Sequence, residues 1–232
     1  MVTRHKSQVT NNFLEVDKFM NKEMKQICRG FKTMKGRTIV GLTGAAASGK
    51  SAALKEFGKL GAFCVSTDQL AKEVLTSRAC YNKILEKFGS GVFLKDGSID
   101  RKKLAKKVFS DKSKRKRLES ILHPEIIKHA LALIKRSNEN IIIVEAPLLF
   151  EAGLEKCFAL TVCVDAPYSL RLERAAARGW ASGELRRRSA AQFTAGEKAA
   201  RADIVIGNDG SLRALRAKVV WIYDFLNKLE NK

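Results

Sequence analysis

The sequence predicts an α/β fold in which helices flank a parallel sheet. From residue 38 onward, short apolar or β-branched runs alternate with longer helical patterns, which is typical of chains that form strand and helix in turn. Polar or turn residues follow each of the short runs. The 232 residues, 45% of them hydrophobic, are enough for one well-packed domain with appendages.

Five short runs are expected to be the strands, because each is apolar or rich in β-branched side chains. They are residues 38–43, 62–66, 141–145, 160–165 and 203–206. Even the most apolar run, 141–144, is only strand-sized, and none approaches the roughly 18 to 20 apolar residues of a membrane-spanning helix. We therefore expect a soluble protein with a five-stranded parallel sheet and no membrane span.

Residues 69–136, between the second and third strands, carry helical patterns with only a weak strand signal at 91–94. An insertion of this length predicts a separate helical lobe beside a core formed by residues 37–68 and 137–232. The lobe holds the densest basic cluster, which is Lys102, Lys103, Lys106, Lys107, Lys114, Arg115, Lys116 and Arg117. Such a cluster suits a localisation signal or a nucleic-acid patch, but a solvated helix face is the commoner case.

Residues 1–36 are polar and basic and precede the first strand. They lack the apolar core of a secretory signal. We expect a basic N-terminal appendage that is either disordered or the product of a start assigned too early. The folded domain would then span residues 37–232.

The formal net charge of +20 gives a strong positive field that attracts polyanions of any kind. Nucleic acid, acidic membrane surfaces and phosphorylated metabolites all qualify, so charge alone does not choose a partner. The cysteines are odd in number and lack the spacing of a zinc site; they are Cys28, Cys64, Cys80, Cys157 and Cys163. We expect reduced, mostly buried thiols in a cytoplasmic protein.

A phosphate-binding loop follows the first strand, and it reads Gly44, Ala45, Ala46, Ala47, Ser48, Gly49, Lys50 and Ser51. This is a full match to the pattern G-x-x-x-x-G-K-S/T, with a helical pattern from Ala52 onward. In such a loop, backbone N–H groups enclose phosphate oxygens, Lys50 bridges the outer phosphates and Ser51 binds Mg²⁺. The loop predicts a P-loop NTPase fold in which residues 44–52 bind ATP with Mg²⁺.

Two carboxylates follow strands at the edge where ligands bind in parallel sheets. Asp68 comes just after the second strand, where it could accept a proton from an attacking hydroxyl, hold the metal through water, or cap the next helix. Glu145 ends the third strand in the manner of a Walker B acid. Position alone does not decide between these roles.

A second basic stretch, residues 171–188, is helical in pattern and is interrupted by Gly179 and Gly183. Arg174 and Arg178 are four positions apart, so they lie on one helical face. Glycines near the ends would let such a segment hinge.

Further motifs occur in a definite order along the chain. They are Leu60-Gly61-Ala62, Thr67-Asp68, Asp96-Gly97, Asp100-Arg101, Leu122-His123-Pro124, Pro147-Leu148-Leu149-Phe150-Glu151, Arg188 with Gln192, and Ala202-Asp203 with Asn208. With the P-loop, they make residues 38–226 similar to the dephospho-coenzyme A kinase family. So many motifs in one order make the resemblance specific.

The resemblance implies transfer of the γ-phosphate of ATP to the ribose 3′-hydroxyl of dephospho-coenzyme A, the last step of coenzyme A synthesis. It implies that Asp68 is the general base and that the helical lobe binds the acceptor. It also implies that Arg174 and Arg178 lie on a lid, at about residues 168–192, that closes over ATP.

The same resemblance suggests contacts for three more residues. Asn208 matches the position that contacts the adenine, although Asn208-Asp209-Gly210 also reads as an ordinary turn. His123 and Glu151 match positions near the acceptor, and a purely structural hydrogen bond is an equal alternative for His123. The resemblance requires no carboxylate at Glu145.

Two positions depart from the family pattern. Ala45 stands where a second glycine is usual, which costs about 1 kcal/mol if that position needs a positive φ. Ser66 stands where the first of two aspartates is common, so Asp68 is left alone.

Three alternatives share part of this evidence. Another small-molecule kinase, such as a nucleoside kinase, would have the same loop and lid. A nucleic-acid-binding P-loop protein would explain the charge, but the sequence has no recognition module, and we expect no specific nucleic-acid partner. A pseudoenzyme would bind ATP and transfer nothing. We expect a monomer or weak oligomer whose partners are ATP and dephospho-coenzyme A.

Overall fold

The structure, a computed structural model, describes Cys28, Gly30, Phe31, Met34 and residues 36–109, 111–190 and 192–230. The described residues form two compact units. One is Thr67–Arg136, and the other contains the described residues before and after it. Most of the expected N-terminal appendage lies outside the described residues.

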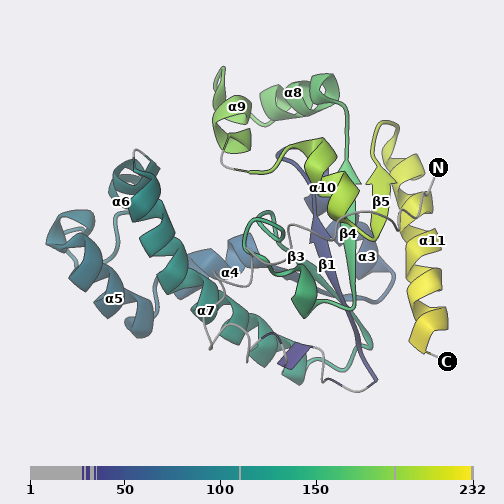
Figure 1. Cartoon of the computed structure of the whole chain (residues 1–232), viewed down its shortest axis with the longest axis horizontal. Coiled ribbons are helices and arrows are strands. Elements are labelled where there is room, and N and C mark those ends of the chain that lie inside the picture. The colour runs from purple at the N-terminus through teal and green to yellow at the C-terminus, as the bar shows by residue number, and fades with distance from the viewer. Residues whose placement is uncertain are drawn as a thin grey trace, which may run out of the picture. The chain divides into compact units, whose positions relative to one another are not determined.

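The larger unit is built on a sheet of five parallel strands, which confirms the predicted fold class (Figure 1). The strands are β1 (Thr38–Thr43), β2 (Phe63–Ser66), β3 (Ile141–Glu145), β4 (Leu160–Asp165) and β5 (Ile204–Gly207). Their order is β2-β3-β1-β4-β5, so β1 is central. Because the strands are parallel, the loops that follow β1 and β3 leave from the same edge of the sheet.

The two outer strands, β2 and β5, begin one residue later than predicted. Ala62 donates its N–H to the carbonyl oxygen of Phe57 at 3.2 Å, at the end of α3 (Lys50–Lys59). The carboxylate of Asp203 accepts hydrogen bonds from N and Oγ1 of Thr161, both at 2.8 Å. Ala62 and Asp203 therefore each lie just before a strand and are not paired within it.

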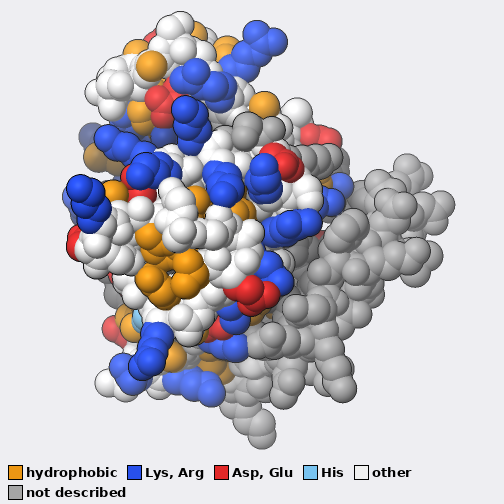
Figure 2. All heavy atoms as spheres, turned by 90° about the vertical axis from the view of Figure 1, so that its left-hand side faces the viewer, with side chains coloured by type: hydrophobic (Ala, Val, Ile, Leu, Met, Phe, Trp, Pro, Cys, Tyr) orange, Lys and Arg blue, Asp and Glu red, His pale blue; other side chains and the backbone are white. Residues whose placement is uncertain are grey.

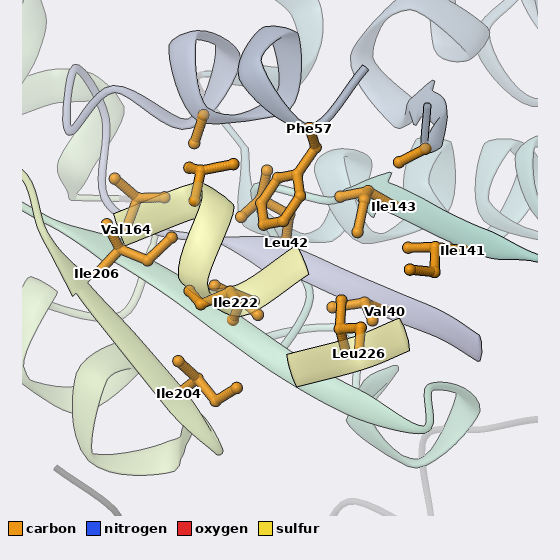
Figure 3. Packing of buried hydrophobic residues seen from close by; sticks show 14 of the residues in the cluster. Val40, Leu42, Phe57, Ile141, Ile143, Val164, Ile204, Ile206, Ile222 and Leu226 are labelled. Carbon is orange, nitrogen blue, oxygen red and sulfur yellow. The ribbon is translucent and has the colours of Figure 1, made fainter. Parts of the chain in front are cut away.

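Apolar side chains at alternate strand positions form the core on one face of the sheet, because successive side chains of a strand point to opposite faces. Phe57 of α3 and Ile222 and Leu226 of α11 (Leu212–Glu230) are fully buried against them (Figure 3). The strand residues are Val40, Leu42, Ile141, Ile143, Val162, Val164, Ile204 and Ile206. β3 is buried at every position, as is usual for a strand covered on both faces.

Three short helices connect β4 to β5: α8 (Tyr168–Ala177), α9 (Glu184–Ser189) and α10 (Ala195–Arg201). α10 contacts β4. It begins with a capping box, in which Thr194 accepts from the N–H of Glu197 and the carboxylate of Glu197 accepts from the N–H of Thr194.

The unit Thr67–Arg136 contains α4 (Thr67–Val74), α5 (Arg78–Phe88), α6 (Arg101–Phe109), α7 (Lys112–Arg136) and a 3₁₀ turn at Ser90–Val92. The long α7 contacts the other three helices. The weak strand signal at residues 91–94 corresponds to an isolated bridge between Phe93 and Ile99.

The basic cluster of residues 102–117 lies on α6 and on the first turns of α7. Some of its lysines form local ion pairs, such as Lys103 with Asp100 at 3.6 Å and Lys114 with Asp111 at 3.3 Å. Figure 2 shows Lys and Arg side chains spread over the visible face, with acidic and apolar groups between them. The local ion pairs and the exposure of most residues of the cluster favour a solvated helix face.

The prediction of five reduced thiols is wrong for two of them. Cys28 and Cys157 form a disulfide bond across 129 positions of the sequence. The ring centroid of Phe31 lies 5.8 Å from that of Phe158. Spacing along the chain gives no sign of such a distant pair.

Cys64, Cys80 and Cys163 are free. Burial raises the pKa of Cys64 to about 11 and that of Cys163 to about 12, so these thiols stay protonated near neutral pH. Among the described residues, no helix combines the length and the apolar character needed to cross a bilayer.

Candidate active site

The P-loop leaves the central strand β1 and enters α3 at Lys50. The N-cap of α3 is Gly49, with φ of 106°, and no side chain caps this helix. The positive end of the helix dipole lies at this terminus and favours an anion there. This geometry agrees with the phosphate-binding role predicted from the motif.

Close contacts with the backbone of β4 fix the start of the loop. Gly44 has φ of 148°, and a Cβ there would lie 2.2 Å from the carbonyl oxygen of Val164, so a larger residue does not fit. Among the described residues other than glycine, the positive φ falls on Ala47, at 61°, and not on Ala45. The replacement of the usual second glycine by Ala45 therefore causes no left-handed strain.

Two polar side chains meet where β1 and β3 end. Oγ of Ser51 donates to Oε1 of Glu145 at 3.2 Å. Glu145 is buried and lies in register with Leu42 of β1 and Ser66 of β2. A hydroxyl and a carboxylate oxygen side by side are a donor pair that suits Mg²⁺. The position of Glu145 after an apolar strand was the signal for it in the sequence.

Lys50 folds back over the loop that it follows. It is 9% exposed, and its Nζ donates to the carbonyl oxygens of Gly44 and Ala45, both at 3.1 Å. The ammonium group therefore lies directly beside the phosphate-binding loop.

Arg174 and Asn208, both predicted to bind ATP, meet at the carbonyl oxygen of Ser48. Nη1 of Arg174 donates to it at 3.2 Å, and Nδ2 of Asn208 donates to it at 2.8 Å. Nη2 of Arg174 also donates to the carbonyl oxygen of Asn208 at 3.0 Å. Both side chains thus hold the P-loop itself. Arg178, at the end of α8, is exposed.

The helices α8 and α9 pack directly on the P-loop. Ala175 of α8 and Leu185 of α9 form a buried apolar cluster with Ala46 and Ala47. The guanidinium of Arg188 lies 4.3 Å from the ring centroid of Trp180 and pairs with Glu184 at 2.6 Å. The segment that was expected to be a lid therefore lies against residues of the P-loop.

The remaining predicted residues have different surroundings. Oε1 of Glu151 pairs with Nζ of Lys198 at 2.9 Å and accepts from the N–H of Phe193 at 2.7 Å. Asp68 is exposed and lies in the first turn of α4, one residue inside the helix and not at its cap. His123 lies within α7, where loss of solvation lowers its pKa.

Comparison with known proteins gives a consistent family assignment. A family model described as dephospho-CoA kinase matches residues 38–214. The dephospho-CoA kinase of Bacillus licheniformis is 38% identical over 200 residues, which cover 83% of this chain and 98% of the relative. That of Moorella thermoacetica is 41% identical over 189 residues, with 78% and 88% covered.

Solved structures agree with this match. The dephospho-CoA kinase from Campylobacter jejuni has a TM-score of 0.61 and 30% identity, covering 84% of this chain and 98% of its own. A Thermus thermophilus protein has a TM-score of 0.72 and 33% identity, with 81% and 97% covered.

Proposed function

This chain belongs to the dephospho-CoA kinase family, and we propose that it transfers the γ-phosphate of ATP to the ribose 3′-hydroxyl of dephospho-coenzyme A. In this reaction the 3′-oxygen forms a bond to the γ-phosphorus and the bond from that phosphorus to the bridging oxygen of ADP breaks. The observation that carries the proposal is the P-loop between β1 and α3, with its uncapped helix terminus and Lys50 beside it.

Within this function, residues 44–52 bind the phosphates of ATP. Backbone N–H groups contact the phosphate oxygens, and Lys50 neutralises charge on the outer phosphates as the transfer proceeds. Arg174 and Asn208 keep the carbonyl of Ser48 in place, which supports a loop that is already shaped for the ligand. The side chain of Arg178, at the end of α8, is exposed. We assign it a direct contact with the bound nucleotide.

A Mg²⁺ ion fits the donors that this site offers. Ser51 and Glu145 would hold it. Ser66, at the end of the neighbouring strand, has no carboxylate, and Glu145 beside it supplies one. When bound with ATP, the metal neutralises charge on the phosphates.

Asp68 is the proposed general base and takes the proton of the 3′-hydroxyl. It follows the carboxyl end of β2 by two residues, and its exposed carboxylate is accessible to a substrate. The unit Thr67–Arg136 would hold the acceptor, with His123 among its contacts. For Glu151, the ion pair with Lys198 favours a positioning role over direct contact with the acceptor.

We also infer a cytoplasmic enzyme that acts as a monomer or weak oligomer. The family of small soluble kinases supports the location. The disulfide between Cys28 and Cys157 opposes it, because disulfides are rare in a reducing cytosol.

A coupled ADP-release assay with Mg-ATP tests the function. Dephospho-coenzyme A is compared with adenosine, nucleoside monophosphates and DNA as acceptors. Turnover confined to dephospho-coenzyme A supports the proposal, whereas turnover only with another acceptor, or stimulated only by DNA, contradicts it. Tight ATP binding without transfer to any acceptor would indicate a pseudoenzyme.

A further inference from the structure

Lys198 of α10 is completely buried, with 0% of its surface exposed. An ammonium group is costly to bury without partners, so its neighbours indicate its role. Its Nζ donates to the carbonyl oxygen of Pro147 at 2.5 Å and pairs with Oε1 of Glu151 at 2.9 Å. Both partners lie in the loop that follows β3.

Glu151 connects this loop to a second segment. Its Oε1 also accepts from the backbone N–H of Phe193 at 2.7 Å, across 42 positions of the sequence. Phe193 lies between the end of α9 and Thr194, the N-cap of α10, so it marks the point where the chain returns from α9. The guanidinium of Arg201 lies 4.6 Å from the centroid of the Phe193 ring and holds the same point from another side.

Both helices of the α8–α9 segment are also attached to the P-loop. Arg174 of α8 donates to the carbonyl oxygen of Ser48. Leu185, near the start of α9, packs against Ala46 and Ala47. The return point of the segment is fixed by Glu151 and Lys198.

We propose that Lys198 and Glu151 are positioning residues for phosphoryl transfer. Their ion pair holds the return point of the α8–α9 segment, and together with the packing of Leu185 it fixes the position of α9 and its arginines. An apolar pair of equal volume would fill the same space, but it would leave the N–H of Phe193 without an acceptor. This inference rests on the proposed function, because those arginines matter only if a phosphoryl group is transferred near them.

Two variants separate positioning from simple stability. Lys198→Met leaves the carboxylate of Glu151 without its cation, and we expect a lower melting temperature and a lower kcat. The double variant Lys198→Met with Glu151→Leu removes both buried charges, an exchange that proteins often tolerate. We expect its melting temperature to rise above that of Lys198→Met, while kcat stays about tenfold to a hundredfold below wild type. The Kd for ADP, which the P-loop holds, should change less than about threefold in each variant.

Lys198→Arg, which keeps the cation, should retain more turnover than Lys198→Met. Recovery of kcat together with stability in the double variant would overturn the inference. Hydrogen exchange of residues 184–190, with and without a non-hydrolysable ATP analogue, needs no acceptor. The analogue should slow exchange there in wild type and have less effect in the double variant. If wild type shows no turnover with dephospho-coenzyme A, the proposed function fails, and equal protection in both proteins would still overturn the positioning role.

Discussion

Gly49 and Gly58 stand near opposite ends of α3 and should respond in opposite ways to alanine. Gly49 has φ of 106°, and a Cβ there would lie 2.1 Å from Nδ2 of Asn208. A Cβ at Gly58 would meet Sγ of Cys64 at 3.5 Å, an ordinary contact. Gly49→Ala should lower the free energy of unfolding by about 1–3 kcal/mol and weaken ATP binding. Gly58→Ala should raise it by about 0.5–1 kcal/mol.

Denaturant unfolding and ATP titration of the two variants measure these effects. Gly58→Ala serves as the matched control, since it adds the same methyl group to the same helix. Equal stability of the two proteins would show that the contact with Asn208 does not constrain the loop.

Replacement of Lys50 tests charge neutralisation in the P-loop. Lys50→Ala should lower kcat by at least about a hundredfold, because the proposed charge neutralisation of the outer phosphates by Lys50 is lost in the transition state. The ADP-release assay measures this. Lys55→Ala, at an exposed position of the same helix, should keep wild-type turnover. A Lys50→Ala enzyme within about threefold of wild type would exclude the assigned role.

The role of Asp68 as base predicts a loss in rate without a loss in nucleotide binding. Asp68→Asn keeps the shape of the side chain but cannot accept the proton, so kcat should fall by about 10²–10⁴-fold, with the Kd for ATP nearly unchanged. Glu73→Gln is the control, because Glu73 is an exposed carboxylate on the same helix. Full activity of Asp68→Asn would end its assignment as the base.

The P-loop residues could be predicted because the motif is local and its neighbours are a strand and a helix. The two hydrogen bonds to the carbonyl oxygen of Ser48 could not be predicted, because Arg174 and Asn208 lie 126 and 160 residues away in the sequence. The positive φ at Ala47 was equally hidden, since alanine gives no sign of that conformation. Sequence reasoning therefore missed the contacts and backbone conformations that depend on segments far apart in the chain.

Among the elements, the strands were the most predictable. A buried strand such as β3 is a short run of four apolar residues that ends in Glu145, and its limits are visible in the sequence. The bounds of the four helices described within residues 67–136 were not predicted. α7 even continues through Pro124, a residue that normally marks a helix boundary.

The partly buried position of His123 in α7 predicts a pH dependence of stability. Loss of solvation lowers the pKa of His123 below its ordinary value of 6.5. The unfolded chain therefore takes up this proton at a higher pH than the folded chain. Above pH 6.5 the titration of His123 does not reduce the free energy of unfolding. Below pH 6.5 it lowers this free energy as the pH falls. His123→Gln should reduce the decline in unfolding free energy between about pH 7 and pH 5.

Denaturant unfolding at several pH values measures this slope. His129→Gln is the matched control, because His129 is exposed on the same helix. If wild type and both variants decline in parallel, burial of His123 does not control the acid sensitivity.

Strand order belongs to the molecule as a whole and could not be derived from local patterns. The pairing of β1 with β3 and β4 brings together residues about one hundred positions apart, and this pairing puts Glu145 beside Ser51. The resemblance to a family supplied the expected function, whereas the chemistry of the Ser51 and Glu145 pair required the assembled sheet.

The covalent link between Cys28 and Cys157 predicts that the N-terminal region contributes to stability and not to catalysis. Removal of residues 1–33 deletes Cys28 and the buried Phe31, which packs against Phe158, whereas removal of residues 1–27 keeps them. The shorter deletion should keep the contribution of the disulfide to the melting temperature. The longer one should lower the free energy of unfolding by about 2–4 kcal/mol for the crosslink, with kcat close to wild type in both.

Dithiothreitol separates the contribution of the disulfide from that of the Phe31 contact. It should lower the melting temperature of the full chain and of the shorter deletion, and have no effect on the longer deletion or on Cys28→Ser. Thiol titration of the denatured, unreduced protein should find three free thiols, those of Cys64, Cys80 and Cys163. Five reactive thiols would mean that the disulfide bond does not form. The disulfide would then no longer argue against a cytoplasmic location.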